Sequence, residues 1–118
     1  MARRTAEEAL SKKAGNVVIL CLRDLSPMTD YFVICDGSSD IHVRAIADHI
    51  CEVLKERGVT PWHVEGREHA HWILIDYIDV VVHVFLEEPR LFYGLERLWG
   101  DAPTEVISAE IEEVGGEG

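Results

Sequence analysis

The chain has 118 residues, 47% of them apolar and 28% charged, with 22 acidic against 11 basic residues and a formal net charge of −11. This length suits one domain with its own hydrophobic core, and no apolar run approaches the roughly 20 residues that cross a bilayer or follows the N-terminal arginines as a signal peptide requires. Such an acidic excess excludes binding to nucleic acid mainly through phosphates, and we expect a cytoplasmic protein, not bound to membranes, whose partner is a basic protein.

The N-terminal part of the sequence predicts one helix followed by two strands. Thr5 and Glu8 have the spacing of a capping box, and the apolar residues that follow predict a helix over residues 6–14. β-branched and apolar residues dominate residues 17–23 and 31–35, which is typical of buried strands. The turn residues between these two runs predict an antiparallel pair.

A second helix follows, with the clearest apolar periodicity in the chain. It begins after Ser39 or Asp40 as N-cap, carries its apolar residues on one face and ends at Gly58. Helices commonly connect parallel strands of one sheet, so we expect the flanking strands, residues 31–35 and 61–65, to run parallel.

The rest of the sequence predicts two more strands, a last helix and a tail. Apolar runs predict strands over residues 71–76 and 80–86, joined by a short connection and therefore antiparallel. Pro89 suits the first turn of a helix whose apolar stripe ends before Gly100. Residues 103–118 carry acidic residues and no basic ones, which predicts an acidic tail that is partly disordered.

Together these elements predict an α/β (α+β) domain over residues 1–102. We expect three layers, with a mixed sheet of about five strands flanked by helices. Val106, Ile107 and Ile111, beyond this domain, are apolar enough to add a short strand or helix to it.

Histidine and cysteine commonly bind metals, but neither forms a ligand pattern here. The histidines are His42, His49, His63, His69, His71 and His83, and the cysteines are Cys21, Cys35 and Cys51. The sequence has no HExxH or CxxC, so we expect no metal and no cofactor, with a metal-binding module as an alternative. His83 lies inside a strand, where we expect a buried imidazole hydrogen-bonded to a backbone carbonyl or to a carboxylate such as Asp79.

A phosphate-transferring enzyme is the second alternative. The Gly-Ser turn at residues 37–39 lies between a strand and a helix, and Asp76 and Asp79 stand near strand ends, as phosphate and magnesium binding would require. Two-metal transferases, however, commonly place two carboxylates on one strand face at positions i and i+2, whereas these aspartates are three apart. No nucleophile with an evident base occurs either, so we do not expect an enzyme.

Alternation along residues 71–76 predicts a strand with two different faces. Trp72, Leu74 and Asp76 share one face, and Ile73, Ile75 and Tyr77 share the other. Aromatic residues and carboxylates at one strand-turn-strand corner suit a protein interface, where aromatic anchors contribute energy and acids select a basic partner. The alternative is that Trp72 belongs to the core and the aspartates only form the turn.

Several segments in this order resemble the ribosomal silencing factor family, also called Iojap. They are TDYFVI at residues 29–34, VRAIAD at 43–48, EG at 65–66, WILIDYIDVVVHVF at 72–85 and FYGLERLWGDA at 92–102. The resemblance implies a fold like that of nucleotidyltransferases without their active site. It also implies a non-catalytic factor that binds the large ribosomal subunit at its fourteenth protein, blocks joining with the small subunit and represses translation when nutrients are scarce. Large-subunit maturation is the alternative activity.

The resemblance also assigns a partner-binding segment. The family's WxLxDYxD pattern falls on Trp72, Leu74, Asp76, Tyr77 and Asp79. Ile78 stands where the family usually has glycine, which either removes a positive-φ turn or adds apolar surface to the interface. We include it in the expected interface, which would also suit a homodimer of the free protein.

Overall fold

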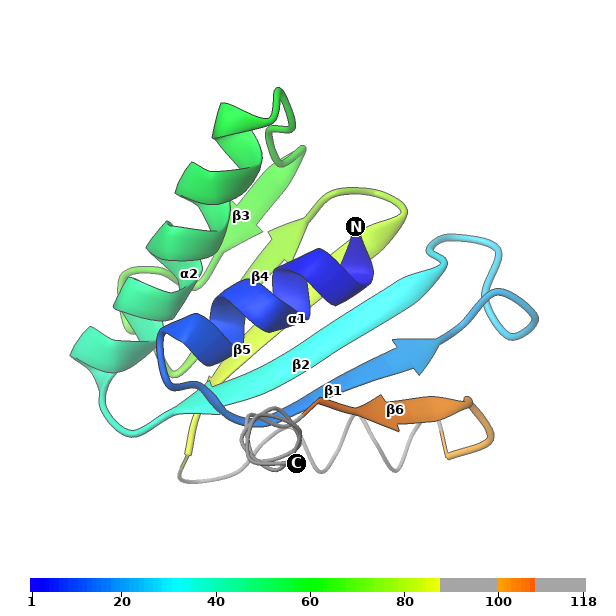
Figure 1. Cartoon of the computed structure of the whole chain (residues 1–118), viewed down its shortest axis with the longest axis horizontal. Coiled ribbons are helices and arrows are strands. Elements are labelled where there is room, and N and C mark those ends of the chain that lie inside the picture. The colour runs from blue at the N-terminus through cyan, green and yellow to red at the C-terminus, as the bar shows by residue number, and fades with distance from the viewer. Residues whose placement is uncertain (88–99, 108–118) are drawn as a thin grey trace, which may run out of the picture.

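The computed structural model describes residues 1–87 and 100–107 of the chain. The elements are α1 (Ala2–Ser11), β1 (Gly15–Cys21), β2 (Tyr31–Gly37), α2 (Asp40–Glu56), β3 (His63–Glu65), β4 (Trp72–Asp76), β5 (Val80–Leu86) and β6 (Thr104–Val106). The strands form one six-stranded sheet in the order β3-β4-β5-β2-β1-β6 (Figure 1). The pair β2 and β5 is parallel and the other neighbours are antiparallel, so the predicted mixed α+β class is confirmed.

The connection through α2 spans more of the sheet than the sequence alone suggested. Strands β2 and β3 run parallel, as expected of strands joined by a helix, but β5 and β4 lie between them. The parallel neighbour of β2 is therefore β5, which comes later in the chain. This arrangement places β5, with its dense valines, in the interior of the sheet.

The sheet has one strand more than predicted. β6 pairs with β1, with Val18 opposite Val106, and the backbone N–H of Ile107 donates to the carbonyl of Val17. The sheet thus continues past residue 102, where the sequence suggested that the domain ends. The predicted last helix, which would form a third layer, and residues 108–118 of the tail lie outside the described residues.

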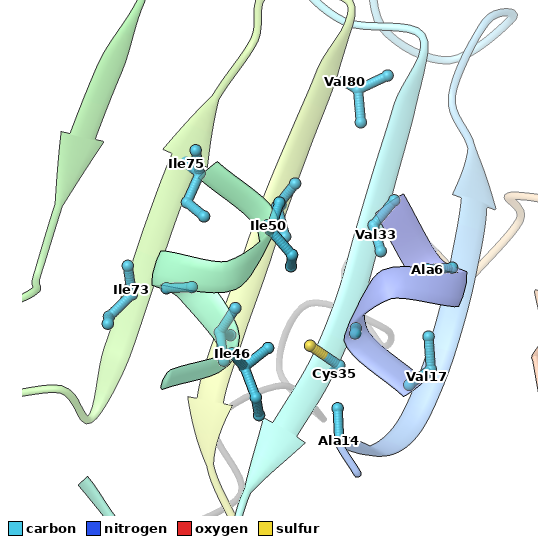
Figure 2. Packing of buried hydrophobic residues seen from close by; sticks show 14 of the residues in the cluster. Ala6, Ala14, Val17, Val33, Cys35, Ile46, Ile50, Ile73, Ile75 and Val80 are labelled. Atoms are coloured by element: carbon cyan, nitrogen blue, oxygen red, sulfur yellow. The ribbon is translucent and has the colours of Figure 1, made fainter. Parts of the chain in front are cut away.

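The main core lies between the sheet and the two described helices, which cover the same face (Figures 1 and 2). Helix α2 contributes its predicted apolar stripe, including Ile46, Ile50 and Leu54, and its N-cap is Ser39, whose hydroxyl accepts from the backbone N–H of His42. A smaller apolar cluster lies on the opposite face of the sheet. No helix in the described ranges is long and apolar enough to span a membrane.

Helix α1 differs from the prediction at both ends. It starts at Ala2 rather than at residue 6, so Thr5 is not its N-cap. The Thr5 side chain is buried, and its hydroxyl donates to the carbonyl of Met1 inside the first turn. Burial of Ala2 against the core explains the earlier start, because tertiary packing outweighs a local capping pattern. The helix ends at Ser11 rather than at residue 14, and Gly15 is the first residue of β1.

Candidate partner-binding surface

Strand β4 separates the predicted faces as expected. Ile73 and Ile75 are fully buried under the helices (Figure 2), whereas Trp72 retains 40% of its accessible surface and Leu74 is half-buried. Val64, on the neighbouring edge strand β3, is opposite Ile75 in the register. The interpretation of Trp72 as a purely core residue is therefore wrong.

A groove of about 490 Å³ lies on the sheet face opposite α1 and α2; Trp72 does not line it but donates a hydrogen bond to His83, which does. Its apolar lining consists of Met28, Phe32, Trp62, Leu74, Ile78 and Val81, and its polar lining consists of Ser26, Thr29, Asp76 and His83. No lysine or arginine occurs among these described lining residues. The groove is thus an apolar surface with one carboxylate, and a basic, partly apolar partner would complement it.

Trp62 and Met28 are groove residues that the sequence analysis missed. They are 72% and 83% exposed and come from two loops, one before β3 and one before β2. A tryptophan in a polar segment after Pro61 was a usable signal, since a large aromatic outside an apolar run is unlikely to be core. Met28 carried no comparable signal, because only the fold brings its loop beside β4.

Behind Trp72, aromatic rings form a stack on the same face. The indole N–H of Trp72 donates to Nδ1 of His83 at 3.0 Å, and the indole stacks on Phe85 with centroids 5.1 Å apart and planes 26° apart. Phe32 meets the other side of this group, in an edge contact with His83 at 4.5 Å.

His83 is buried as predicted, but its predicted hydrogen-bond partner is wrong. It bonds to Trp72 rather than to a carbonyl or to Asp79, because its side chain projects toward the face that carries Trp72 while Asp79 lies in the turn before β5. Burial lowers the pKa of His83 from 6.5 to about 4. The imidazole is therefore neutral at neutral pH.

The corner between β4 and β5 is a tight turn closed by backbone and carboxylate contacts. An Asp76 carboxylate oxygen accepts from the N–H of Ile78 at 2.7 Å, and the N–H of Tyr77 donates to the carbonyl of Val80. Ile78 has φ +72° and is 56% exposed. Of the two predicted consequences of Ile78, loss of the positive-φ turn is wrong, because the turn is kept, and added apolar surface is confirmed.

Asp79 anchors this corner to the start of β2. Its carbonyl accepts from the N–H groups of Asp30 and Tyr31, at 2.9 and 3.1 Å, and its side chain is exposed. The two aspartates of the corner thus have different roles in the turn. The Asp76 side chain closes it, and the Asp79 backbone carbonyl holds it against the start of β2.

Tyr77 lies on the other side of the sheet from the groove. It is 8% exposed and belongs to the core under the helices, with its hydroxyl beside the Cys51 thiol but without a hydrogen bond of good geometry. Burial raises the pKa of the Tyr77 phenol above its ordinary value. Leu74, Asp76 and Ile78 thus line the groove and Asp79 lies at the corner. Trp72 contacts the groove residue His83 from the other end of β4, and the Tyr77 ring lies on the opposite face.

The structure does not assemble the groups that the enzyme alternative needs. The Gly-Ser turn at residues 37–39 follows the end of β2, where Gly37 is opposite Leu86, whereas Asp76 and Asp79 flank the start of β5. A seven-residue strand separates the two ends by about 20 Å. A second cavity beside the turn contains Lys12, Asp36 and Glu87, but in the described parts of the chain no three potential ligands cluster to hold a metal.

Comparison with known proteins shows the family of the chain. The family model "Ribosomal silencing factor during starvation" matches residues 1–117. The chain belongs to the ribosomal silencing factor family. It is 50% identical over 93 residues to ribosomal silencing factor RsfS of Halalkalibacterium halodurans, covering 79% of this chain and 80% of that protein. It is 46% identical over 92 residues to RsfS of Bacillus subtilis, covering 78% of each.

A solved structure shows the same silencing-factor fold. A crystal structure of a protein from Bacillus halodurans superposes with a TM-score of 0.78 at 42% identity, covering 89% of this chain and 96% of that one. More distant relatives include the chloroplast Iojap protein of Zea mays, 32% identical, and a mouse protein named for mitochondrial assembly of the ribosomal large subunit, 34% identical. This chain covers 42% and 38% of the lengths of those two proteins.

Proposed function

We propose that this ribosomal silencing factor binds the large ribosomal subunit at its fourteenth protein and so prevents the small subunit from joining. The result is repression of translation by steric occlusion, under nutrient limitation and in the cytoplasm. Family membership supports a role at the ribosome, and the name of the mouse relative supports the large subunit.

The exposed Trp72 beside an apolar groove is the observation that carries the proposal. An exposed indole and a groove with apolar walls bury much area when covered, and aromatic anchors commonly contribute most of an interface's binding energy. The carboxylates of Asp76 and Asp79 at the corner favour lysine and arginine on the partner. This arrangement needs no chemistry and fits a factor that acts by occupying a surface.

Co-sedimentation with isolated large subunits, small subunits and joined ribosomes tests the proposal. We expect the wild type to travel with free large subunits and the double variant Trp72→Ala, Asp79→Arg to lose that binding. The matched control is Ile41→Ala, Glu52→Arg, which makes the same types of change at exposed positions of α2, on the other side of the sheet. The proposal fails if the wild type and the Trp72→Ala, Asp79→Arg variant bind large subunits equally, or if neither of them binds.

Large-subunit maturation is a second candidate, favoured by the assembly function in the name of the mouse relative. It begins with the same binding event, and only its consequence differs. Subunit-joining assays distinguish the two, since a silencing factor inhibits joining of mature subunits. A homodimer of the free protein through the same groove would compete with ribosome binding, and sedimentation of the free protein at rising concentration tests it.

A further inference from the structure

The indole N–H of Trp72 is already used within the chain. It donates to Nδ1 of His83 at 3.0 Å, and His83 is 3% exposed while Trp72 is 40% exposed. The part of Trp72 that a partner can reach is thus its carbon surface, and its one hydrogen-bond donor points inward. The contact that a partner makes with Trp72 therefore depends on the orientation of the indole ring.

Two further contacts define that orientation. One face of the indole stacks on Phe85, which is opposite Trp72 in the register of β4 and β5 and is fully buried. His83, two residues before Phe85 on the same strand face, meets the edge that carries the N–H. Stacking alone is compatible with both of the roughly twofold-related χ2 orientations of the indole, whereas the hydrogen bond selects the one that points the N–H at His83.

The protonation state of His83 suits it to this contact. Its burial among Phe32, Trp72 and Phe85 disfavours the charged form, so Nδ1 keeps a lone pair that can accept the indole proton. The proton of the neutral ring must then lie on Nε2. That atom is buried and has no hydrogen-bond partner in the described part of the chain.

An unpaired buried donor lowers stability, so the histidine is not explained by stability alone. A leucine at position 83 would fill similar space without an unpaired N–H of its own, but it would leave the Trp72 N–H without its acceptor. What histidine supplies and leucine lacks is the acceptor for Trp72.

We propose that His83 is a positioning residue of the partner-binding surface, which accepts the Trp72 N–H and holds the indole in its binding orientation before the partner arrives. The proposal rests on the proposed function, because Trp72 is its anchor. His83 lines the groove but is only 3% exposed, so it offers a partner little contact surface of its own. Its contribution is preorganisation, which lowers the entropy lost by Trp72 on binding.

The test compares His83→Leu, which removes the acceptor, with His83→Asn, whose amide oxygen retains an acceptor near the Nδ1 position. Binding to purified large subunits and urea unfolding are measured on the same preparations. We expect the Kd of His83→Leu to rise about three- to tenfold, the value of one hydrogen bond, and that of His83→Asn to lie closer to wild type. The unfolding midpoint of His83→Leu should lie near that of the wild type, because loss of the acceptor for Trp72 offsets removal of the unpaired Nε2–H.

A double-mutant cycle adds a readout that a merely structural role does not produce. In a Trp72→Phe background no N–H remains to be held, so His83→Leu should cause no further loss of binding. The inference is overturned if His83→Leu binds as tightly as the wild type, if it loses binding and stability together, or if its loss persists in the Trp72→Phe background. If the wild type itself does not bind, the proposed function has failed first and this inference falls with it.

Discussion

Ile78 is a strained residue at an exposed corner, which predicts that one substitution will shift stability and binding in opposite directions. At φ +72° a β-branched side chain crowds its own backbone, and the left-handed region costs about 1–2 kcal/mol for a residue with a Cβ. Glycine removes this strain but loses about 0.5–1 kcal/mol more backbone entropy on folding. We therefore expect Ile78→Gly to raise the free energy of unfolding by about 1 kcal/mol.

The same substitution should weaken the proposed partner binding. Ile78 is 56% exposed and lines the groove, so a partner covering it would bury roughly half of a side chain whose full burial is worth about 1.5–3 kcal/mol. The loss is about 1 kcal/mol, or about a fivefold rise in Kd. Ile78→Ala is the matched control, because it removes most of the apolar surface and keeps the Cβ that causes the strain.

Urea unfolding and large-subunit binding, measured on all three proteins, check both halves of the prediction. The unfolding midpoint should be highest for glycine, with alanine near the wild type, whereas both variants should bind more weakly than the wild type. A glycine variant less stable than the alanine variant would refute the strain argument. Unchanged binding in both variants would show that Ile78 lies outside the interface.

Three further predictions concern buried groups and glycines. The pKa of His83 is about 4 in the folded protein and 6.5 in the unfolded chain, so the unfolded chain takes up the proton first as the pH falls. The free energy of unfolding should therefore fall by about 3 kcal/mol between pH 6.5 and pH 4. A wild type that loses no more stability over this range than His83→Leu contradicts this. Gly66→Ala should lower the free energy of unfolding by about 3 kcal/mol or more, measured by thermal unfolding, because at φ +86° a Cβ would lie 2.0 Å from the Trp72 carbonyl oxygen. The control Gly58→Ala, at φ +82° with nothing within 4 Å of the Cβ, should lower it by only about 1 kcal/mol. Equal losses would disprove the clash. Tyr77→Phe removes a buried hydroxyl that lacks a well-formed hydrogen bond. Its subunit binding should equal that of the wild type, and its free energy of unfolding should equal or exceed the wild-type value. Weaker binding would place the phenol in the interface.

The sequence by itself determined the elements whose pattern is local. The apolar periodicity of α2 and the alternation along β4 depend on residues close in the chain, and both appear where they were expected. The N-cap of α2 is Ser39, one of the two residues that the sequence left open. The division of β4 into a buried and an accessible face followed from the same alternation, since a period of two fixes which side chains share a face. The accessible face of β4 was therefore readable from the sequence, but the loop residues Met28 and Trp62 beside it were not.

Tertiary structure decided everything that depends on contacts distant in sequence. Burial of Ala2 moved the start of α1, and the pairing of β6 with β1 took the sheet past residue 102. Only the sheet order brought Met28 to the groove and separated the Gly-Ser turn from Asp76 by the length of β5. The partner of His83 was likewise set by the register between β4 and β5, because which side chain a buried group meets depends on strand pairing, not on its neighbours in the chain.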